Sequence, residues 1–249
     1  MTPLILRPQP AADELADLLR QQGHSPVVCP LLSYLPGSEL GALTERLSQA
    51  DMVIAISVAA VQYASEQLAK QLARWPQHCI YLAVGATTAA QWQQQGVKVI
   101  SPTDARSEGL LALPELQVAG GKNVLILRGN GGRELLADVL SALGAQVSYL
   151  ECYRRHYLHT DGTPLLQEWQ AAGVDSVIIS SSKLFRQLIR LLPETASDWL
   201  SSQHWFVPSQ RTADEIHQAG FNRVTIMSGV QHDAVVAALQ NNPEDITHE

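Results

Sequence analysis

The two halves of this 249-residue chain repeat one another. At an offset of 121, residues 4–23 and 125–144 share nine identical positions, namely Leu4, Ile5, Leu6, Arg7, Leu15, Ala16, Asp17, Leu19 and Gly23 of the first segment. At an offset of 124, Asp51, Val53, Ile54, Ser57, Thr88, Ala89, Gln94 and Gly96 match Asp175, Val177, Ile178, Ser181, Thr212, Ala213, Gln218 and Gly220. The change of offset corresponds to one small insertion. Because stacked repeats have periods of roughly 20 to 50 residues, this much longer period predicts two copies of one domain.

Each half reads as alternating strands and helices. The short apolar runs of strand length are Leu4–Leu6, Met52–Ile56, Ile80–Val84, Val97–Ile100, Val124–Leu127, Ser176–Ile179, Trp205–Val207 and Arg223–Met227. Segments with helical spacing, such as Ala11–Gln22 and Arg133–Leu143, lie between them. Helical stretches end at Gly23, Gly96, Gly144 and Gly220, where a left-handed residue commonly terminates a helix. This alternation predicts an α/β fold of two similar domains, each a parallel sheet flanked by helices.

Composition and charge narrow the class of protein. The hydrophobic content of 46% is ample for a globular core. The net charge of −7, with Lys and Arg dispersed along the chain, argues against nucleic acid as a partner. The longest apolar run, residues 52–56, is too short to span a membrane, and the first residues carry no basic targeting region. We therefore expect a cytoplasmic protein without a membrane contact.

Small polar groups follow the predicted strands. They are Arg7-Pro8, Ser57, Gly85-Ala86-Thr87-Thr88, Arg128-Gly129-Asn130-Gly131-Gly132-Arg133, Ser180-Ser181-Ser182-Lys183 and Pro208-Ser209-Gln210-Arg211-Thr212. Ligands of open parallel sheets bind beyond the carboxyl ends of the strands. Each of these segments also opens a helix, whose free amides and dipole favour a carboxylate or phosphate. Helix starts of this kind would let a negatively charged chain bind a polyanion.

A structural explanation competes with binding at each position. Ser and Thr at helix starts are ordinary N-caps, and capping alone is the favoured interpretation for any one of Ser57, Thr88, Ser181, Ser209 and Thr212. For residues 128–133 the favoured interpretation is function, because two arginines around a glycine turn serve structure poorly.

Familiar cofactor and metal motifs are incomplete in this chain. Glu134 stands where a dinucleotide-binding glycine pattern needs its third glycine, and Asn123 stands where a phosphate-binding loop needs Ser or Thr. His156 and His159 lack a metal-binding neighbourhood, and the three cysteines form no close pair. No nucleophile elbow is present. The sequence thus predicts no cofactor and no metal, and leaves an enzyme or a binding protein.

Features along the whole chain resemble uroporphyrinogen-III synthase, especially its enterobacterial type. They are the Arg-Pro pair after the first strand, a Thr-Ala pair after a strand in each half, and Cys152-Tyr153 near the middle. The segments 125–135 and 151–153 are the most specific.

The resemblance implies a domain division that the repeat alone does not. A tandem division would cut the chain near residues 114–121. The family instead implies a discontinuous domain of residues 1–33 with 155–249, and an inserted domain of residues 37–150. Residues 31–36 and 152–159 would form a two-stranded linker, a slender hinge about which the domains open and close.

The resemblance also implies the chemistry: cyclisation of linear hydroxymethylbilane to uroporphyrinogen III, with ring D inverted and water lost. Tyr153 would donate a proton or hydrogen bond to the leaving hydroxyl. The implied substrate-binding residues are Arg7, Ser57, Gly85, Thr88, Arg128, Gly129, Asn130, Arg133, Ser181, Lys183, Ser209 and Thr212. The Ser209-Gln210-Arg211 segment departs from the glycine-containing turn of many relatives, which puts backbone contacts there in question.

The expected oligomeric state and two other functions remain to be stated. We expect a monomer that makes at most transient contact with hydroxymethylbilane synthase. Two other functions stay open at this point: a two-lobed protein that binds a sugar or polyanion without turnover, and a nucleotide-dependent transferase, which the missing phosphate loop disfavours.

Overall fold

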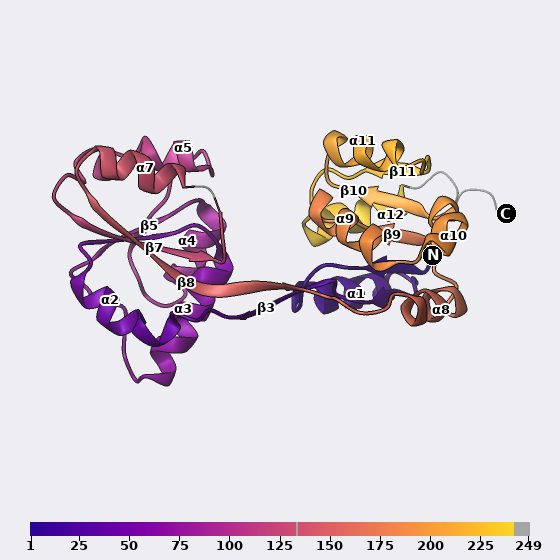
Figure 1. Ribbon diagram of the computed structural model, residues 1–249, viewed down its shortest axis with the longest axis horizontal. Coiled ribbons are helices and arrows are strands. Elements are labelled where there is room, and N and C mark those ends of the chain that lie inside the picture. Colours follow the sequence, from indigo (N-terminus) through magenta and orange to yellow (C-terminus); the bar gives the residue numbers. More distant parts are fainter. Residues whose placement is uncertain (133, 242–249) are drawn as a thin grey trace. The chain divides into compact units, whose positions relative to one another are not determined.

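The computed structural model describes residues 1–132 and 134–241. The chain divides into two compact units (Figure 1). The outer unit consists of Met1–Ser33 together with the segment that starts at His156, and the inner unit is Tyr34–Arg155. No helix in the described part of the chain has the length and apolar character needed to cross a membrane.

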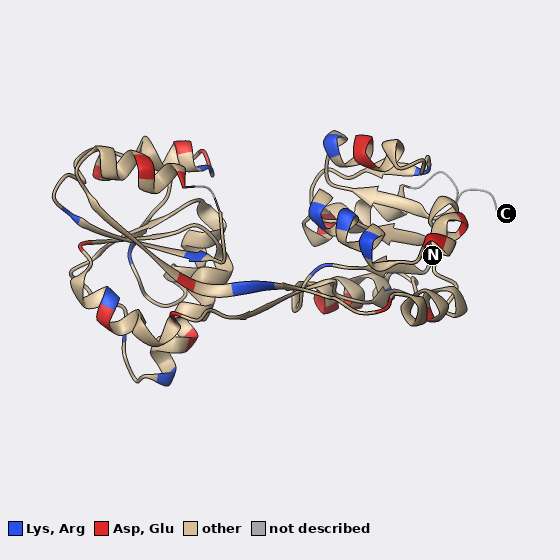
Figure 2. Cartoon of the chain, viewed as in Figure 1, with Lys and Arg blue, Asp and Glu red and all other residues tan. Residues whose placement is uncertain are grey.

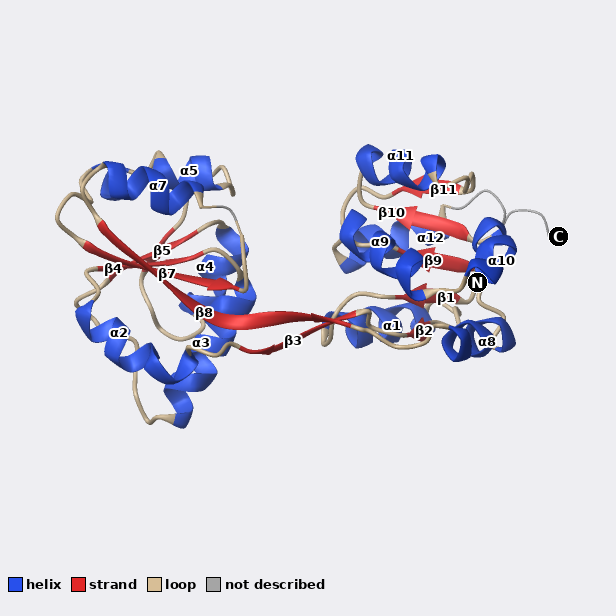
Figure 3. Ribbon diagram, viewed as in Figure 1, coloured by secondary structure: helices blue, strands red, loops and turns tan. Residues whose placement is uncertain are grey.

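The outer unit is a five-stranded sheet with strand order β11-β10-β9-β1-β2, in which every neighbouring pair is parallel. Its strands are β1 (Pro3–Ile5), β2 (Val27–Val28), β9 (Ser176–Ile178), β10 (His204–Val207) and β11 (Val224–Ile226). Its helices are α1 (Ala11–Gln21), α8 (Thr163–Ala171), α9 (Ser182–Leu191), α10 (Ser197–Ser202), α11 (Gln210–Gln218) and α12 (His232–Gln240), with a short 3-10 turn η2 (Glu194–Ala196) (Figure 3).

Helices α1 and α12 bury an apolar face against this sheet. Leu15 and Leu19 of α1 pack with Ile5 of β1 and Phe206 of β10, and all four side chains are fully buried. Burying such side chains stabilises the fold by about 1.5–3 kcal/mol each. The spacing of four residues places Leu15 and Leu19 on one side of the helix, which explains why this segment is helical here.

The inner unit is a six-stranded sheet with strand order β3-β8-β7-β4-β5-β6. Its strands are β3 (Leu32–Pro36), β4 (Met52–Ala55), β5 (Ile80–Ala83), β6 (Val99–Ile100), β7 (Asn123–Gly129) and β8 (Gln146–Tyr157). Its helices are α2 (Leu43–Gln49), α3 (Val58–Lys70), α4 (Ala86–Gln93), α5 (Ser107–Leu111), α6 (Pro114–Gln117) and α7 (Leu135–Ala142), with a 3-10 turn η1 (Leu40–Ala42). The five strands from β8 to β6 are parallel.

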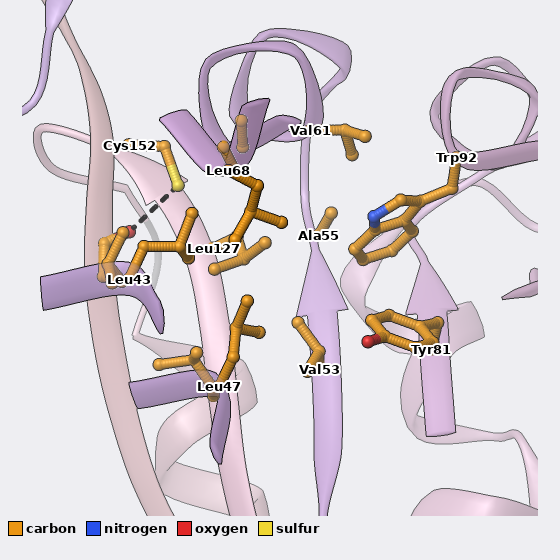
Figure 4. Packing of buried hydrophobic residues seen from close by; sticks show 14 of the residues in the cluster. Leu43, Leu47, Val53, Ala55, Val61, Leu68, Tyr81, Trp92, Leu127 and Cys152 are labelled. Carbon is orange, nitrogen blue, oxygen red and sulfur yellow. Dashed lines mark hydrogen bonds between the residues drawn. The ribbon is translucent and has the colours of Figure 1, made fainter. Parts of the chain in front are cut away.

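Both faces of the inner sheet are buried. Val53 and Ala55 of β4 lie in one core cluster, whereas Met52 and Ile54 of the same strand lie in the other. Figure 4 shows the first cluster, in which Trp92 packs over Tyr81 beside β4. A strand with both faces covered reads as a continuous apolar run, which is why residues 52–56 resemble a core segment in the sequence.

The two units exchange parts of the repeat. At the repeat offset, β7 and β8 correspond to β1 and β2, while β9, β10 and β11 correspond to β4, β5 and β6. The inner order β8-β7-β4-β5-β6 therefore matches the outer order β2-β1-β9-β10-β11 strand for strand. Each unit combines the first two strands of one copy with the last three strands of the other.

The predicted α/β fold is confirmed, and a strand lies at each of the eight predicted places. The four helix-ending glycines have the expected left-handed backbone, with φ from +73° to +93°. The sequence did not reveal the length of β8, a twelve-residue strand whose polar second half pairs with β3. Backbone hydrogen bonds from Gly37 N to Cys152 O and from Leu158 N to Leu31 O belong to this pairing.

Candidate active site

The hydroxyl of Tyr153 lies near the carboxyl end of the inner sheet. Its side chain is only 2% exposed. The Ser57 hydroxyl donates a hydrogen bond to the Tyr153 Oη over 3.3 Å, and Nη2 of Arg155 donates another over 3.2 Å. The guanidinium carbon of Arg155 also lies 5.5 Å from the centre of the Tyr153 ring. The phenol oxygen therefore accepts two hydrogen bonds, one of them from a cation, and keeps its own proton available to a third group.

Aromatic neighbours and one glycine fix the Tyr153 ring. The Tyr34 ring meets it edge-on at 5.0 Å between centroids, and the Tyr63 ring stacks at 6.1 Å. The Tyr63 hydroxyl donates to the Tyr34 carbonyl over 2.7 Å, which ties these two neighbours together. A Cβ placed on Gly129 would fall 2.6 Å from Cζ of Tyr153, so only glycine leaves room for the ring in this position.

Ser57 begins helix α3 directly after strand β4. Its Oγ accepts a hydrogen bond from the Ala60 amide over 3.2 Å, the usual bond of an N-cap. The same hydroxyl donates to Tyr153. Ser57 thus satisfies one helix amide and at the same time orients the phenol.

The turn after β7 is tied into the inner unit by its own side chains. Arg128 Nη1 lies 3.0 Å from Oε1 of Glu134, and its guanidinium carbon lies 4.1 Å above the Tyr149 ring. Burial raises the pKa of Tyr149 to about 12. Oδ1 of Asn130 accepts from the Arg155 amide over 2.7 Å. Arg128 is therefore already engaged within the fold.

Helix α4 offers an uncapped N-terminus after strand β5. Gly85 precedes the helix, which has no side-chain cap, so its first amides are free for a ligand. A Cβ on Gly85 would fall 2.7 Å from Cβ of Ala105, which explains the glycine by close packing. Thr88 is 5% exposed, and the described residues provide no hydrogen bond for its hydroxyl.

The outer unit carries the equivalent helix starts of the second copy. Ser181 caps α9 and Ser209 caps α11, each through a hydroxyl that accepts from an amide over 3.4 Å. Oγ1 of Thr212 lies 3.2 Å from both Ser209 Oγ and Ser182 Oγ, so this buried threonine joins the two helix starts. Lys183 is exposed.

Arg7 is the outer-unit equivalent of Arg128, but its surroundings differ. Its side chain follows β1 and is 7% exposed. Nε and Nη2 are buried without a hydrogen-bond partner among the described residues. Burial also lowers the pKa of the Arg7 guanidinium. A buried cation without partners is costly, and its unused donors are suited to a carboxylate.

Comparison with known proteins identifies the family of this chain. The family described as uroporphyrinogen-III synthase HemD matches residues 13–237. A uroporphyrinogen-III synthase from Escherichia coli K12 is 39% identical over 246 residues, covering 96% of this chain and 100% of the relative. The chain belongs to the uroporphyrinogen-III synthase family. The enzyme of the same description from Salmonella typhimurium is also 39% identical, with the same coverage.

Solved structures carry the same fold as this synthase-family chain. A mutant uroporphyrinogen III synthase from Thermus thermophilus aligns over 97% of this chain and 100% of its own with a TM-score of 0.62 at 16% identity. A uroporphyrinogen-III synthetase from Helicobacter pylori aligns with a TM-score of 0.60, also at 16% identity, over 97% of this chain and 100% of its own. The two-domain α/β architecture is therefore shared across widely diverged sequences.

The residues expected from the synthase resemblance fall into two groups. The inner unit brings together Tyr153, Ser57, Gly129, Asn130 and Arg128, with Gly85 and Thr88 at the next strand end. The outer unit holds Arg7, Ser181, Lys183, Ser209 and Thr212. Arg133 lies outside the described residues. The capping interpretation is confirmed for Ser57, Ser181 and Ser209 by their hydrogen bonds. It is wrong for Thr88 and Thr212, which lie in the first turns of α4 and α11, after the N-caps Gly85 and Ser209.

The sequence did not predict three residues of the site, namely Arg155, Tyr34 and Tyr63. A signal for Arg155 was present, because residues two apart on an extended strand share a face and Arg155 follows Tyr153 by two. Tyr34 and Tyr63 come from β3 and α3, and no local pattern links them to β8.

Proposed function

We propose that this chain closes linear hydroxymethylbilane into uroporphyrinogen III, inverting ring D and releasing one water molecule. The observation that carries the proposal is the Tyr153 hydroxyl, held by Ser57 and Arg155 at the carboxyl end of the inner sheet. The full-length match to curated synthases supports it. A role in tetrapyrrole biosynthesis follows from this reaction.

Tyr153 supplies the proton for the leaving group. Its phenol protonates the substrate hydroxyl, which departs as water and leaves an azafulvene cation. Nη2 of Arg155 donates a hydrogen bond to the phenol oxygen and stays beside it as the proton leaves. The substituted carbon of ring D then attacks the cation. The resulting spiro intermediate fragments and recloses, and the final deprotonation returns a proton to the phenolate.

The helix starts and Arg7 hold the acetate and propionate arms of the substrate. The uncapped amides of α4 and the unused N–H groups of Arg7 can donate to carboxylates without breaking an existing hydrogen bond. Lys183 adds an exposed cation in the outer unit. Arg128 donates to Glu134 through Nη1 and can offer its other N–H donors to a carboxylate. Holding the flexible chain so that the substituted carbon lies nearest the cation is worth several kcal/mol.

A coupled isomer assay tests this function. Hydroxymethylbilane is generated in place by its synthase, this protein is added, and the oxidised uroporphyrins are separated by chromatography. An excess of isomer III that depends on the protein is expected. Isomer I alone, formed in the presence of folded protein, would contradict the synthase function and leave a two-lobed binding protein to be tested by ligand titration.

We also propose where the enzyme works, in which oligomeric state, and about which hinge its domains move. We expect a cytoplasmic monomer without a cofactor, in transient contact at most with hydroxymethylbilane synthase. Residues 31–36 and 152–159 are proposed as the two-stranded hinge between a domain of residues 1–33 with 155–249 and one of residues 37–150. Sedimentation velocity checks the monomer, and small-angle scattering with and without product checks the hinge.

A further inference from the structure

A cavity of about 610 Å³ lies at the end of the inner sheet opposite to Tyr153. It opens at the amino end of β5, whereas Gly85 and Thr88 follow the carboxyl end of that strand. Residues from the end of α3, the 73–79 segment and the segment before β6 line it. Its volume is within the range of small-molecule sites in proteins. Among the described residues, none that is assigned to the synthase reaction contributes to it.

An aromatic wall with a fixed position forms one side of this cavity. The half-buried Trp75 ring meets Tyr81 edge-on at 5.7 Å and Trp92 edge-on at 5.5 Å between centroids. The Tyr81 hydroxyl donates to the Pro76 carbonyl over 2.7 Å, which holds the backbone beside Trp75. Trp75 is therefore pre-ordered, so a planar ligand that stacks on it loses little side-chain entropy on the protein.

The charged residues among the described lining of the cavity are both cations. Arg74 and Lys98 are both exposed at it, and neither has an ion-pair partner within residues 1–132 and 134–241. No acidic residue is among the described lining residues, although acids outnumber bases in the whole chain by 24 to 17. Figure 2 shows where the basic and acidic residues lie along the chain. The cavity is thus locally positive in a negatively charged protein, which favours an anion.

One further polar group of the lining lacks a partner. The Ser65 hydroxyl is buried and makes no hydrogen bond with the described residues. A buried hydroxyl without a partner is unfavourable, so a hydrogen-bonding group that reaches it from the cavity is favoured. The aromatic wall, the two cations and the unpartnered hydroxyl together favour a ligand with a flat ring and a carboxylate.

We propose that this cavity, lined by Trp75, Arg74, Lys98 and Ser65, is a second binding site for a small planar aromatic carboxylate. The ring packs on Trp75, and the carboxylate meets Arg74 and Lys98. The site is independent of the proposed cyclisation, since it uses other residues at the opposite end of the strands. Occupancy here and turnover at Tyr153 are separately measurable.

Nuclear magnetic resonance of the ¹⁵N-labelled full chain tests the proposal, with 2-naphthoate as the probe. The Trp75 indole signal, assigned with Trp75→Phe, should shift saturably with a Kd on the order of 1 mM or tighter. The neutral isostere 2-naphthamide should bind about tenfold more weakly, because it lacks the charge that the two cations recognise. Equal binding of the two probes, or no saturable shift at Trp75, would overturn the proposal.

Matched variants test whether Arg74 and Lys98 are the cations that bind the carboxylate. The double variant Arg74→Gln with Lys98→Gln should weaken 2-naphthoate about tenfold and leave 2-naphthamide unchanged. Lys122→Gln removes an exposed cation of the same unit outside the cavity and should leave both affinities unchanged. All three positions are exposed, so the variants should keep the fold, which the dispersion of the same spectra verifies. Equal weakening by Lys122→Gln would show a general charge effect and refute the site.

Discussion

Gly129 on β7 lies against the face of Tyr153 on β8, with space for a hydrogen but not for a methyl group. A Cβ at position 129 would fall 2.6–3.0 Å from three ring carbons of Tyr153. The register of the two strands shifts at this point, where Arg128 pairs with Glu151 and Gly129 with Tyr153. The irregularity turns the tyrosine ring over the neighbouring backbone, and from there its hydroxyl reaches Ser57.

Replacing Gly129 with alanine should displace the Tyr153 ring. Overpacking of this kind costs about 1–3 kcal/mol of unfolding free energy, and the phenol would lose its alignment with Ser57. Denaturant unfolding measures the first effect, and the isomer III yield measures the second. Gly41→Ala is the matched control, because nothing lies within 4 Å of a Cβ at that position. Equal behaviour of the two variants would contradict the packing argument.

Tyr153→Phe keeps the ring and removes the proton donor. The rate of isomer III formation should fall about 100-fold, with a loss of stability of about 1 kcal/mol for the missing hydrogen bonds. Tyr81→Phe also removes a hydroxyl from a mostly buried tyrosine of the inner unit, one bonded to the Pro76 carbonyl, and should leave the isomer ratio unchanged. A fully active Tyr153→Phe enzyme would exclude the proposed acid.

Arg7→Met should separate stability from function. The variant removes a buried cation whose Nε and Nη2 have no partner in the described part of the chain, so the unfolding free energy should stay the same or rise by about 1–2 kcal/mol. KM for hydroxymethylbilane should rise at the same time, because a carboxylate loses its anchor. Arg20→Met, at an exposed ion pair of the same unit, should change neither quantity. A marked loss of stability in Arg7→Met would assign the arginine to the fold instead.

The two equivalent threonines should respond differently to valine. Thr212→Val removes the hydroxyl that lies within hydrogen-bond distance of both Ser182 Oγ and Ser209 Oγ, and should cost about 1–3 kcal/mol of unfolding free energy. Thr88→Val removes a hydroxyl without a hydrogen bond among the described residues, so stability should hold while KM rises. Thermal unfolding and steady-state kinetics of both variants check the contrast.

Cys152 should make the protein less stable in alkali. Burial raises the pKa of this thiol from 9.0 to about 12. Above pH 9.0 the unfolded chain releases the proton and the folded chain keeps it, so stability falls by up to about 1.4 kcal/mol per pH unit until pH nears 12. Unfolding curves of the Cys152→Ala variant should fall less steeply over this window. Identical slopes would show that the thiol is not protected from solvent in the fold.

The sequence predicted the parallel core because parallel strands that are buried on both faces have continuous apolar sequences. Residues 52–55 and 124–127 are examples, and their pairing in β4 and β7 follows. The second half of β8 carries polar and charged residues, so its apolar signal is weak although its backbone is extended. The short β2 has only two residues, too few for a periodicity to register.

The site was predictable at the strand ends and not between distant segments. Ser57, Ser181 and Ser209 stand where a strand stops and a helix begins, a local pattern. The hydrogen-bond partners of Arg7 and Arg128 were not predictable, although the two residues occupy the same position of the repeat. Arg128 lies beside Glu134 and Tyr149, whereas Nε and Nη2 of Arg7 have no hydrogen-bond partner among the described residues. Those differences depend on tertiary packing around each arginine.

The exchange of strand pairs between the two copies gives this single chain the topology of a domain-swapped dimer. Two half-length chains that traded their first two strands would build both units, and one peptide connection between the copies would then make the exchange permanent. A free dimer of that kind depends on concentration and falls apart on dilution, whereas the fused chain does not. With both copies in one chain, the pairing of the two halves no longer depends on protein concentration, and the two copies can differ in the surroundings of equivalent residues such as Arg7 and Arg128.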